Sequence, residues 1–172
     1  LEELRREYAA SGLPFGEETG QGVYERLTAY ASTWSKAQRR ACEATSRPEQ
    51  LREQLACLEH RRLAFASRLE RLRSADAAIV EQAIDVAGEL PDVALCIDAA
   101  STQVPTRPSS HALMVKNIES RTLASVGRAE DARTLADEVV ADAQARGDVW
   151  AQLEALRARA RAKLELGRVE SA

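Results

Sequence analysis

The stretch SRPEQLREQLACLEHRRLAFASRLERL, residues 46–72, decides the fold class of this chain. It opens with helix-start signals: Ser46 suits a cap, Pro48 suits a first turn, and Glu49 stands three positions after the serine, as in a capping box. Apolar residues then recur at steps of three, four and seven; they are Leu51, Leu55, Leu58, Phe65, Leu69 and Leu72. This spacing predicts a long helix with a coiled-coil-like seam, interrupted once at Arg62.

A second long helix is expected before this one, from about Glu17 to Thr45. Its apolar positions recur at three- and four-residue steps; they are Val23, Leu27, Tyr30, Trp34 and Ala41. Residues 1–11 read as the end of another helix, which Gly12 and Pro14 break. Two long helices joined by a short turn lie antiparallel when they share a core. We therefore expect an antiparallel helical hairpin.

The composition also favours an all-α fold. Hydrophobic residues make up 45% of the chain and aromatic residues only 4%. Ala, Leu, Glu and Arg dominate, and these side chains lose little rotamer freedom in a helix. The formal charge is about +2 over residues 1–74 and −5 over residues 75–172. Neither part has the basic excess of a nucleic-acid-binding surface, so no nucleic-acid partner is expected.

A domain boundary is expected in the linker STQVPTRPSS, residues 101–110. Before it, a helix over about 75–89 ends at Pro91, and residues 92–98 fit either a short helical turn or a strand. This gives a cysteine-bearing helical domain over 1–100 and a second domain over 111–172.

The second domain is predicted to hold tetratricopeptide-like repeats. Helices are expected at about 110–126, 128–146 and 148–166. GRAEDA, residues 127–132, recurs after 40 residues as GRVESA, residues 167–172. Each glycine suits a sharp turn between antiparallel helices, which is the mechanics of such repeats. The chain also begins with Leu rather than Met, so we expect an excised piece whose second repeat is truncated, with GRVESA opening a further helix.

The three cysteines leave several possibilities open. Cys42 and Cys57 flank the hairpin turn, and an antiparallel hairpin would allow the Cα separation that a disulfide needs. Buried free thiols are the alternative. A zinc site with Cys57, His60 and Cys42 lacks a fourth ligand, since the chain has only two histidines and no C-x-x-C. We expect no metal and no cofactor.

Three strings resemble a region of large bacterial serine/threonine protein kinases of the Hanks type, as found in myxobacteria. They are WSKAQRRACEAT (34–45), LREQLACLEHRRLAFASRLERL (51–72) and EQAIDVAGELPDVALCID (81–98). In that family a kinase domain, often followed by a membrane-spanning helix, precedes a cysteine-bearing helical segment and tetratricopeptide repeats. The resemblance implies a downstream sensor or scaffold region of a membrane-anchored kinase, with an extracytoplasmic location as one option. In that setting a Cys42–Cys57 disulfide is favoured, and Cys96 pairs elsewhere or is a core residue.

The catalytic machinery of a kinase does not carry over to this chain. GEETGQG, residues 16–22, lacks a preceding strand and a following Lys, and HRR, residues 60–62, lies inside a predicted helix. We expect no catalytic and no cofactor-binding residue. The favoured function is protein or peptide binding for a parent kinase. The alternatives are a coiled-coil-like oligomerisation module, or an enzyme whose site has no recognisable motif.

A candidate interaction surface lies on the last helix. Apolar residues recur there at helical spacing, and Trp150 stands near the helix start; the candidate surface comprises Trp150, Leu153, Leu156 and Leu164. Val149 and Ala160 belong to the same stripe. Without a capping helix part of this stripe should be exposed, which predicts a weak homodimer through the C-terminal helix or fraying of its last turns. RARARAK, residues 157–163, alternates Arg and Lys with Ala and is expected to be a solvated face.

Overall fold

Every regular element of the described chain is helical, in a computed structural model that describes residues 1–44, 48–73, 77–97 and 110–170. The α-helices are α1 (Glu2–Ala9), α2 (Gly16–Ala44), α3 (Pro48–Arg73), α4 (Ala77–Gly88), α5 (His111–Ser125), α6 (Ala129–Arg146) and α7 (Val149–Glu170), with one 3-10 helix, η1 (Ala94–Cys96). Within these residues there is no strand, so the prediction of an all-α fold is confirmed.

The chain divides into two compact units, unit 1 (Leu1–Thr106) and unit 2 (Arg107–Ala172), which are described separately below. The predicted linker 101–110 lies outside the described residues except for Ser110, as does the predicted cap Ser46. Ser110 caps α5, because its hydroxyl accepts a hydrogen bond from the Leu113 backbone N–H at 3.3 Å.

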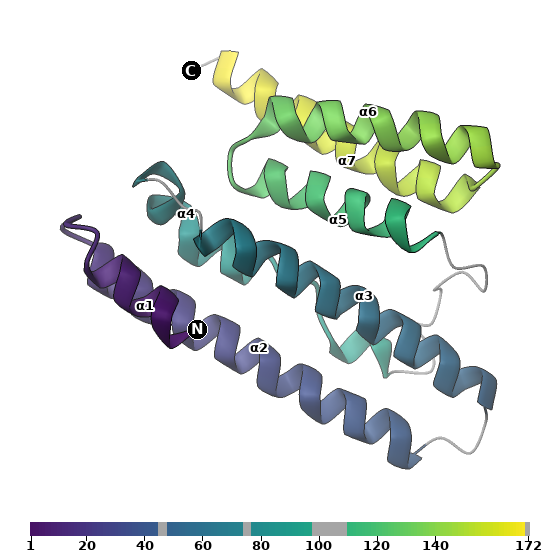
Figure 1. The fold of residues 1–172 in the computed structure, drawn as a ribbon, viewed down its shortest axis with the longest axis horizontal. Helices are drawn as coiled ribbons and strands as arrows, with labels where there is room; N and C mark the ends of the chain where they lie inside the picture. Colours follow the sequence, from purple (N-terminus) through teal and green to yellow (C-terminus); the bar gives the residue numbers. More distant parts are fainter. Residues whose placement is uncertain (45–47, 74–76, 98–109, 171–172) are drawn as a thin grey trace. The chain divides into compact units, whose positions relative to one another are not determined.

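In unit 1, α2 contacts α1, α3 and α4. Figure 1 shows α2 and α3 as the two long helices of this unit, running in opposite directions. Val23 and Leu27 of α2 are fully buried. Further along, Trp34 donates its indole N–H to the Leu58 carbonyl at 2.8 Å, and the rings of Tyr30 and Phe65 stack with centroids 5.7 Å apart. Aromatic contacts therefore join the middle of α2 to the middle of α3.

Helix α1 lies unusually close to the start of α2, and glycines make this possible. A Cβ added at Gly20 would come within 2.9 Å of the Arg5 carbonyl oxygen and of Tyr8 Cβ. One added at Gly16 would overlap the Tyr8 carbonyl oxygen. Gly16 and Gly20 therefore allow α1 to pack closely against the first turns of α2.

Unit 2 consists of α5, α6 and α7, each of which contacts the other two (Figure 1). Its core is built from small side chains and a few larger ones; buried members are Leu113, Leu123, Ala132, Ala136, Val139, Ala143, Ala151, Ala155, Ala158 and Ala162. Two buried polar side chains of α5 reinforce this packing. Ser120 donates to the Ala132 carbonyl at 2.8 Å, and Asn117 donates to the Ala151 carbonyl at 3.2 Å. The abundance of alanine lets the helix axes approach closely.

Two glycines end helices in unit 2 by the same mechanism. Gly127 and Gly147 have φ values of 76° and 65°, in the left-handed region that favours glycine. After each, the next backbone N–H reaches back five residues to a helix carbonyl: Arg128 to Leu123 and Asp148 to Ala143, both at 2.9 Å. The expected helix breaks at these two positions are confirmed.

Gly167 behaves differently, and here the sequence-based prediction is wrong. Helix α7 runs through Gly167 to Glu170, and the Gly167 backbone does not have a positive φ. GRVESA therefore does not begin a new helix within the described residues. The letters of GRAEDA and GRVESA match, but a helix-ending glycine must adopt the left-handed conformation, and Gly167 remains helical. The start of α7 does follow prediction, because Asp148 Oδ1 accepts from the Ala151 N–H at 2.9 Å.

Candidate functional site

The most distinctive surface of unit 2 is an apolar stripe along α7, which we call the α7 outer face. It comprises Val149, Trp150, Leu153, Leu156, Ala160 and Leu164. Val149 is 75% exposed, Leu164 67%, Trp150 38% and Leu153 37%. Leu156 is half-buried and Ala160 is exposed. The structure thus brings together on one face all four residues of the predicted interaction surface.

The opposite side of α7 is lined by alanine. Ala151, Ala155, Ala158 and Ala162 are buried against α5 and α6. At about 100° per residue, the two sets lie roughly 180° apart around the helix. A surface helix ordinarily turns its larger apolar side chains inward, whereas α7 turns small side chains inward and larger ones outward. Such an exposed apolar patch is typical of an interaction site.

Basic side chains border this stripe. Arg157 and Lys163 lie at the two edges of its aliphatic part, and both are exposed. Arg157 pairs with Glu154 within α7 at 2.7 Å, and Arg159 pairs with Asp137 of α6 at 3.2 Å. RARARAK is solvated, as expected, except that Ala158 and Ala162 between the basic residues are buried. The basic side chains therefore extend from a helix whose alanine side is packed against the rest of unit 2.

Unit 1 contains a disulfide that differs from the expected one. Cys57 is bonded to Cys96, with their Cα atoms 5.5 Å apart, and Cys42 is a free, exposed thiol. The expected Cys42–Cys57 bridge is therefore wrong. Because Trp34 of α2 bonds to Leu58 of α3, the neighbouring Cys57 lies opposite the part of α2 around Trp34. Cys42 lies eight residues further along α2, which is roughly 12 Å at about 1.5 Å per residue.

Cys96 belongs to η1, and η1 is part of a segment that we call the strap, residues 89–97. Four side chains from the two long helices donate hydrogen bonds to backbone carbonyls of the strap. The bonds are Arg68 to Glu89 at 3.1 Å, Tyr30 to Pro91 at 3.1 Å, Arg61 to Asp92 at 3.2 Å and Gln54 to Ile97 at 3.2 Å. Beneath the strap, Val93 and Cys96 pack against Leu58, Ala37 and Ala41. The disulfide and these bonds together hold the strap against α2 and α3.

Two tyrosines of unit 1, the buried Tyr8 and the half-buried Tyr30, bond their hydroxyls to carbonyls. Tyr8 donates to the Leu72 carbonyl at 3.0 Å, and Tyr30 donates to the strap. Burial raises the pKa of Tyr8 to about 12, and the neighbouring Glu7 charge acts in the same direction. Burial likewise raises the pKa of Tyr30 to about 12, against the opposing effect of Arg61 and Arg68. Both phenols are thus held neutral as hydrogen-bond donors, which is a structural role.

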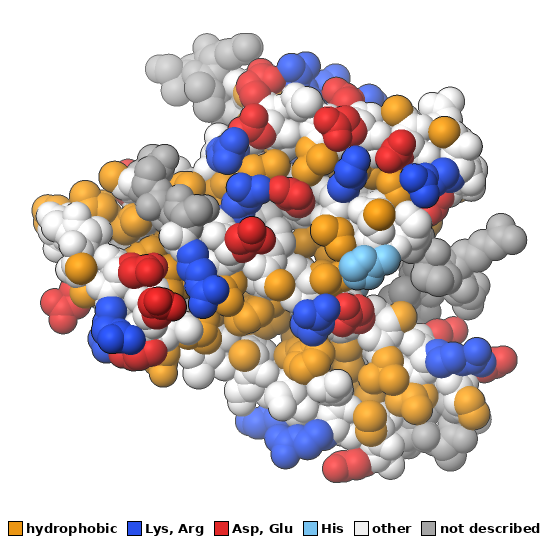
Figure 2. Space-filling view, viewed as in Figure 1, with side chains coloured by type: hydrophobic (Ala, Val, Ile, Leu, Met, Phe, Trp, Pro, Cys, Tyr) orange, Lys and Arg blue, Asp and Glu red, His pale blue; other side chains and the backbone are white. Residues whose placement is uncertain are grey.

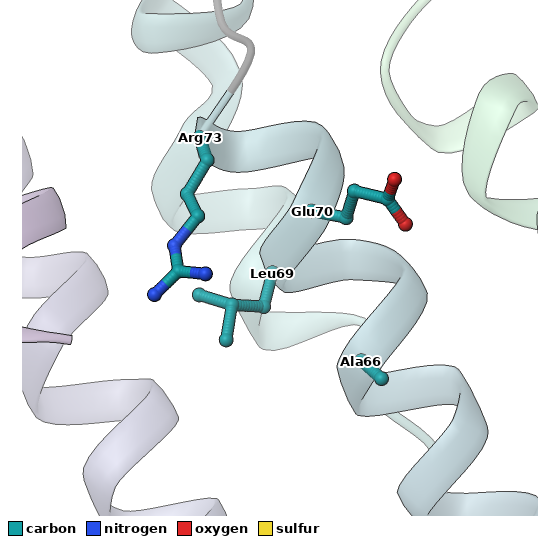
Figure 3. Close-up of a pocket in the computed structure, with 4 residues that line it drawn as sticks. All are labelled: Ala66, Leu69, Glu70 and Arg73. Atoms are coloured by element: carbon teal, nitrogen blue, oxygen red, sulfur yellow. The ribbon is translucent and has the colours of Figure 1, made fainter.

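A shallow hollow lies on α3, lined by Ala66, Leu69, Glu70 and Arg73 (Figure 3). All four residues come from one face of one helix. Figure 3 shows the Glu70 carboxylate and the Arg73 guanidinium pointing in different directions. The lining holds no nucleophile and no converging acid and base, so its geometry offers no acid–base or nucleophilic chemistry.

No metal site forms in the part of the chain that the structure describes. There, no three His, Cys, Asp or Glu side chains gather closely enough to hold an ion. Cys57 is oxidised in the disulfide and so cannot act as a thiolate ligand beside His60.

Figure 2 shows basic and acidic side chains interspersed on the visible face. Of the described helices, not one combines the length and the apolar character that crossing a bilayer requires.

Comparison with known proteins found no matching family model, curated protein or solved structure. The functional assignment therefore depends on the surfaces described above.

Sequence reasoning found the α7 outer face but missed the strap. Besides Tyr30 of α2, the strap is held by three residues of α3 that would ordinarily be read as solvated positions: Gln54, Arg61 and Arg68. One signal was present: three basic or amide side chains at steps of seven lie along a single helix face. Polar side chains on a buried helix face need hydrogen-bond acceptors. The backbone carbonyls of a neighbouring segment outside regular secondary structure can provide these acceptors.

Proposed function

We propose that this chain is a non-catalytic protein-interaction module that binds a partner through the α7 outer face. The observation that supports the proposal is the arrangement of α7, with alanines buried inside and Val149, Leu153 and Leu164 exposed outside. Exposing these side chains costs free energy, at about 25 cal/mol per Å² of apolar surface, which a bound partner would recover.

Unit 2 fits this role as a tetratricopeptide-like array. In this interpretation, α5 and α6 form one antiparallel helix pair, and α7 is the first helix of a second pair. The contacts of α7 with both preceding helices support the interpretation. In such arrays each helix pair stacks on the next and leaves an extended surface for ligands. In unit 1, the corresponding proposal is an antiparallel hairpin of α2 and α3.

We also propose a serine/threonine protein kinase as the parent protein, with this chain as its sensor or scaffold region. This proposal rests on the resemblance of the strings at 34–45, 51–72 and 81–98. Its test is the gene context: a kinase domain encoded upstream of Leu1 would support it, and an unrelated domain would contradict it.

The apolar seam of α3 is a weaker candidate for a surface that pairs with another copy of the chain. Leu58 and Leu72 are fully buried inside unit 1, and Leu51 and Leu55 pack against the core beneath the strap. Pairing between copies through this seam would require unit 1 to open. For this reason we favour the α7 outer face over a coiled-coil oligomerisation module.

A weak homodimer through the same face is the second candidate, favoured by the exposure of Leu164. Sedimentation of the full chain over a range of concentrations tests it. A dimer that dissociates in Leu164→Glu would support the homodimer, whereas a strictly monomeric chain would contradict it.

The main experiment is a selection of helical peptides displayed on phage against the full chain. We expect enriched peptides to lose binding to a Leu153→Glu/Leu164→Glu variant, because two buried carboxylates would replace apolar contacts. Both positions are exposed, so the variant should retain its helical circular dichroism and thermal midpoint.

The matched control is Leu95→Glu, an exposed leucine of the strap in unit 1. It adds a single carboxylate at an apolar surface position outside α7, and peptide binding should persist. The proposed function fails if no peptide is enriched, or if enriched peptides bind the double variant as well as the original chain.

A further inference from the structure

We propose that the partner of the α7 outer face is an acidic amphipathic helix. This inference rests on the proposed function and specifies the chemistry of the ligand. It is drawn from the width of the stripe, the sign of the charges along its edges, and the way in which unit 2 already packs an acidic helix against basic neighbours.

The stripe has the dimensions of a helix-binding face. Its aliphatic members, from Val149 to Leu164, fall within an arc of about 80° at about 100° per residue. Along the axis they extend for about 22 Å, at roughly 1.5 Å per residue. A single apolar helix stripe of about four turns would cover this area. Side chains of a second helix would pack between those of α7, as ridges pack into grooves at helix–helix contacts.

Charge sets the sign of the partner. Arg157 and Lys163 lie on either edge of the stripe, and Arg159 and Arg161 lie further round on the two sides. The acidic residues of α7 with described side chains, Glu154 and Glu165, lie on the flank of Arg157 and Arg161 but further from the stripe, and Glu154 is engaged by Arg157 and Arg121. A partner helix would therefore meet basic groups on both flanks.

The same unit already shows this kind of pairing between helices. Helix α6 carries five acidic and two basic side chains. Its Asp137 pairs with Arg159 of α7 at 3.2 Å, and its Glu138 pairs with Lys116 of α5 at 3.6 Å. An acidic helix thus packs through its apolar residues while its carboxylates meet basic side chains of the neighbouring helices. The proposed partner would repeat this arrangement on the outer side of α7.

The charges disfavour a second copy as the occupant of the face. Two copies laid stripe to stripe would bring Arg157 and Lys163 of each chain together, and like charges repel. An anionic lipid surface is distinguished from an acidic helix by the experiment below.

The experiment uses two designed peptides of about 20 residues with the same leucine stripe. One has glutamates flanking the stripe, and the other has lysines at the same positions. Binding to the full chain is measured by fluorescence anisotropy at low and high salt. We expect the acidic peptide to bind at least about tenfold more tightly than the basic one, since its carboxylates would pair with the basic side chains along the stripe and the lysines would be repelled by them. This preference should shrink in high salt.

Charge reversal on the protein provides the decisive test. In Arg157→Glu/Lys163→Glu, the preference should invert toward the basic peptide. The matched control is Arg133→Glu on the surface of α6, where the acidic peptide should remain preferred. Binding of the chain to anionic vesicles and sedimentation of the chain alone test whether a lipid surface or a second copy occupies the face instead.

The outcomes separate this inference from the proposed function. If both peptides bind equally, charge reversal has no effect and Leu153→Glu/Leu164→Glu abolishes binding, then the face binds helices and the acidic partner is wrong. If neither peptide binds, or if vesicles or a second copy occupy the face through Leu153 and Leu164, the inference is overturned. An inverted preference confined to the α7 charge variant would support it.

Discussion

Gly147 and Gly167 stand twenty residues apart, yet their backbones adopt different conformations. Gly147 has a φ of 65° and ends α6, while Gly167 lies inside α7. Nothing lies within 4 Å of a Cβ built on either residue, so backbone conformation alone distinguishes them. Substitution by alanine should therefore have opposite effects at the two positions.

We expect Gly147→Ala to lower the free energy of unfolding by about 1–2 kcal/mol, because a side chain is strained in the left-handed region. Gly167→Ala should raise it, by up to about 1 kcal/mol, because alanine is the better helix former. Chemical denaturation followed by circular dichroism measures both changes. A loss of stability in Gly167→Ala would show instead that Gly167 ends a helix, as the repeat of GRAEDA suggested.

The same pair of residues shows a limit of sequence reasoning. Letters identify a glycine, but the left-handed conformation arises only where the chain must turn, and packing against other helices decides this. The cysteines show a second limit. Cys42 and Cys57 both lie near the predicted turn. The position of α3 along α2 is set by the contact of Trp34 with Leu58, however, and this contact leaves Cys42 too far along α2 to reach Cys57.

At the scale of elements, apolar periodicity predicted the helices well. The predicted ranges 17–45 and 128–146 agree with α2 and α6 to within one residue at each end. Periodicity reports on burial along one helix, so it carried no information about the strap. That segment is held by tertiary hydrogen bonds from Tyr30 of α2 and from three side chains of α3, and these bonds depend on the proximity of chain segments far apart in sequence.

The disulfide gives the element-scale prediction. Cys57 and Cys96 are 39 residues apart, and closing a loop of that length in the unfolded chain stabilises the fold by up to about 4 kcal/mol on the loop-entropy estimate. We expect Cys96→Ser to lower the free energy of unfolding of unit 1 by about 2–4 kcal/mol. Denaturant unfolding without reductant measures this change.

Cys42→Ser is the matched control, because Cys42 is exposed and unpaired with another cysteine. It should leave stability unchanged, and peptide mapping of the original chain should recover a Cys57–Cys96 peptide. Recovery of a Cys42–Cys57 peptide, or equal loss of stability in the two variants, would contradict the pairing.

At the scale of the whole molecule, the two units differ in how they respond to alkali. All three tyrosines of the chain lie in unit 1, and each unit contains one tryptophan, Trp34 or Trp150. Folding raises the pKa of Tyr8 and Tyr30 from 10.0 to about 12. The neutral phenols therefore stabilise unit 1 fully below pH 10, and this contribution is lost as the pH rises through about 12.

We expect the thermal midpoint of unit 1 to fall between about pH 10 and pH 12 by more than that of unit 2. Trp34 reports unit 1 in a Trp150→Phe variant, and Trp150 reports unit 2 in Trp34→Phe. Replacing Tyr8 by Phe in the Trp34 reporter should flatten the fall, since one titrating group is removed. Equal falls in both units, or no effect of Tyr8→Phe, would contradict the assignment.

The strap is held by its backbone, and this has a consequence for how its sequence is able to vary. The four donors bond to carbonyl oxygens, which every amino acid provides. Genetic drift at the exposed positions Ala94 and Leu95 should therefore be tolerated, while Val93 and Cys96 remain under selection. A library randomised at Ala94 and Leu95 could carry inserted recognition sequences, so the strap is a natural place to graft new loops onto this scaffold.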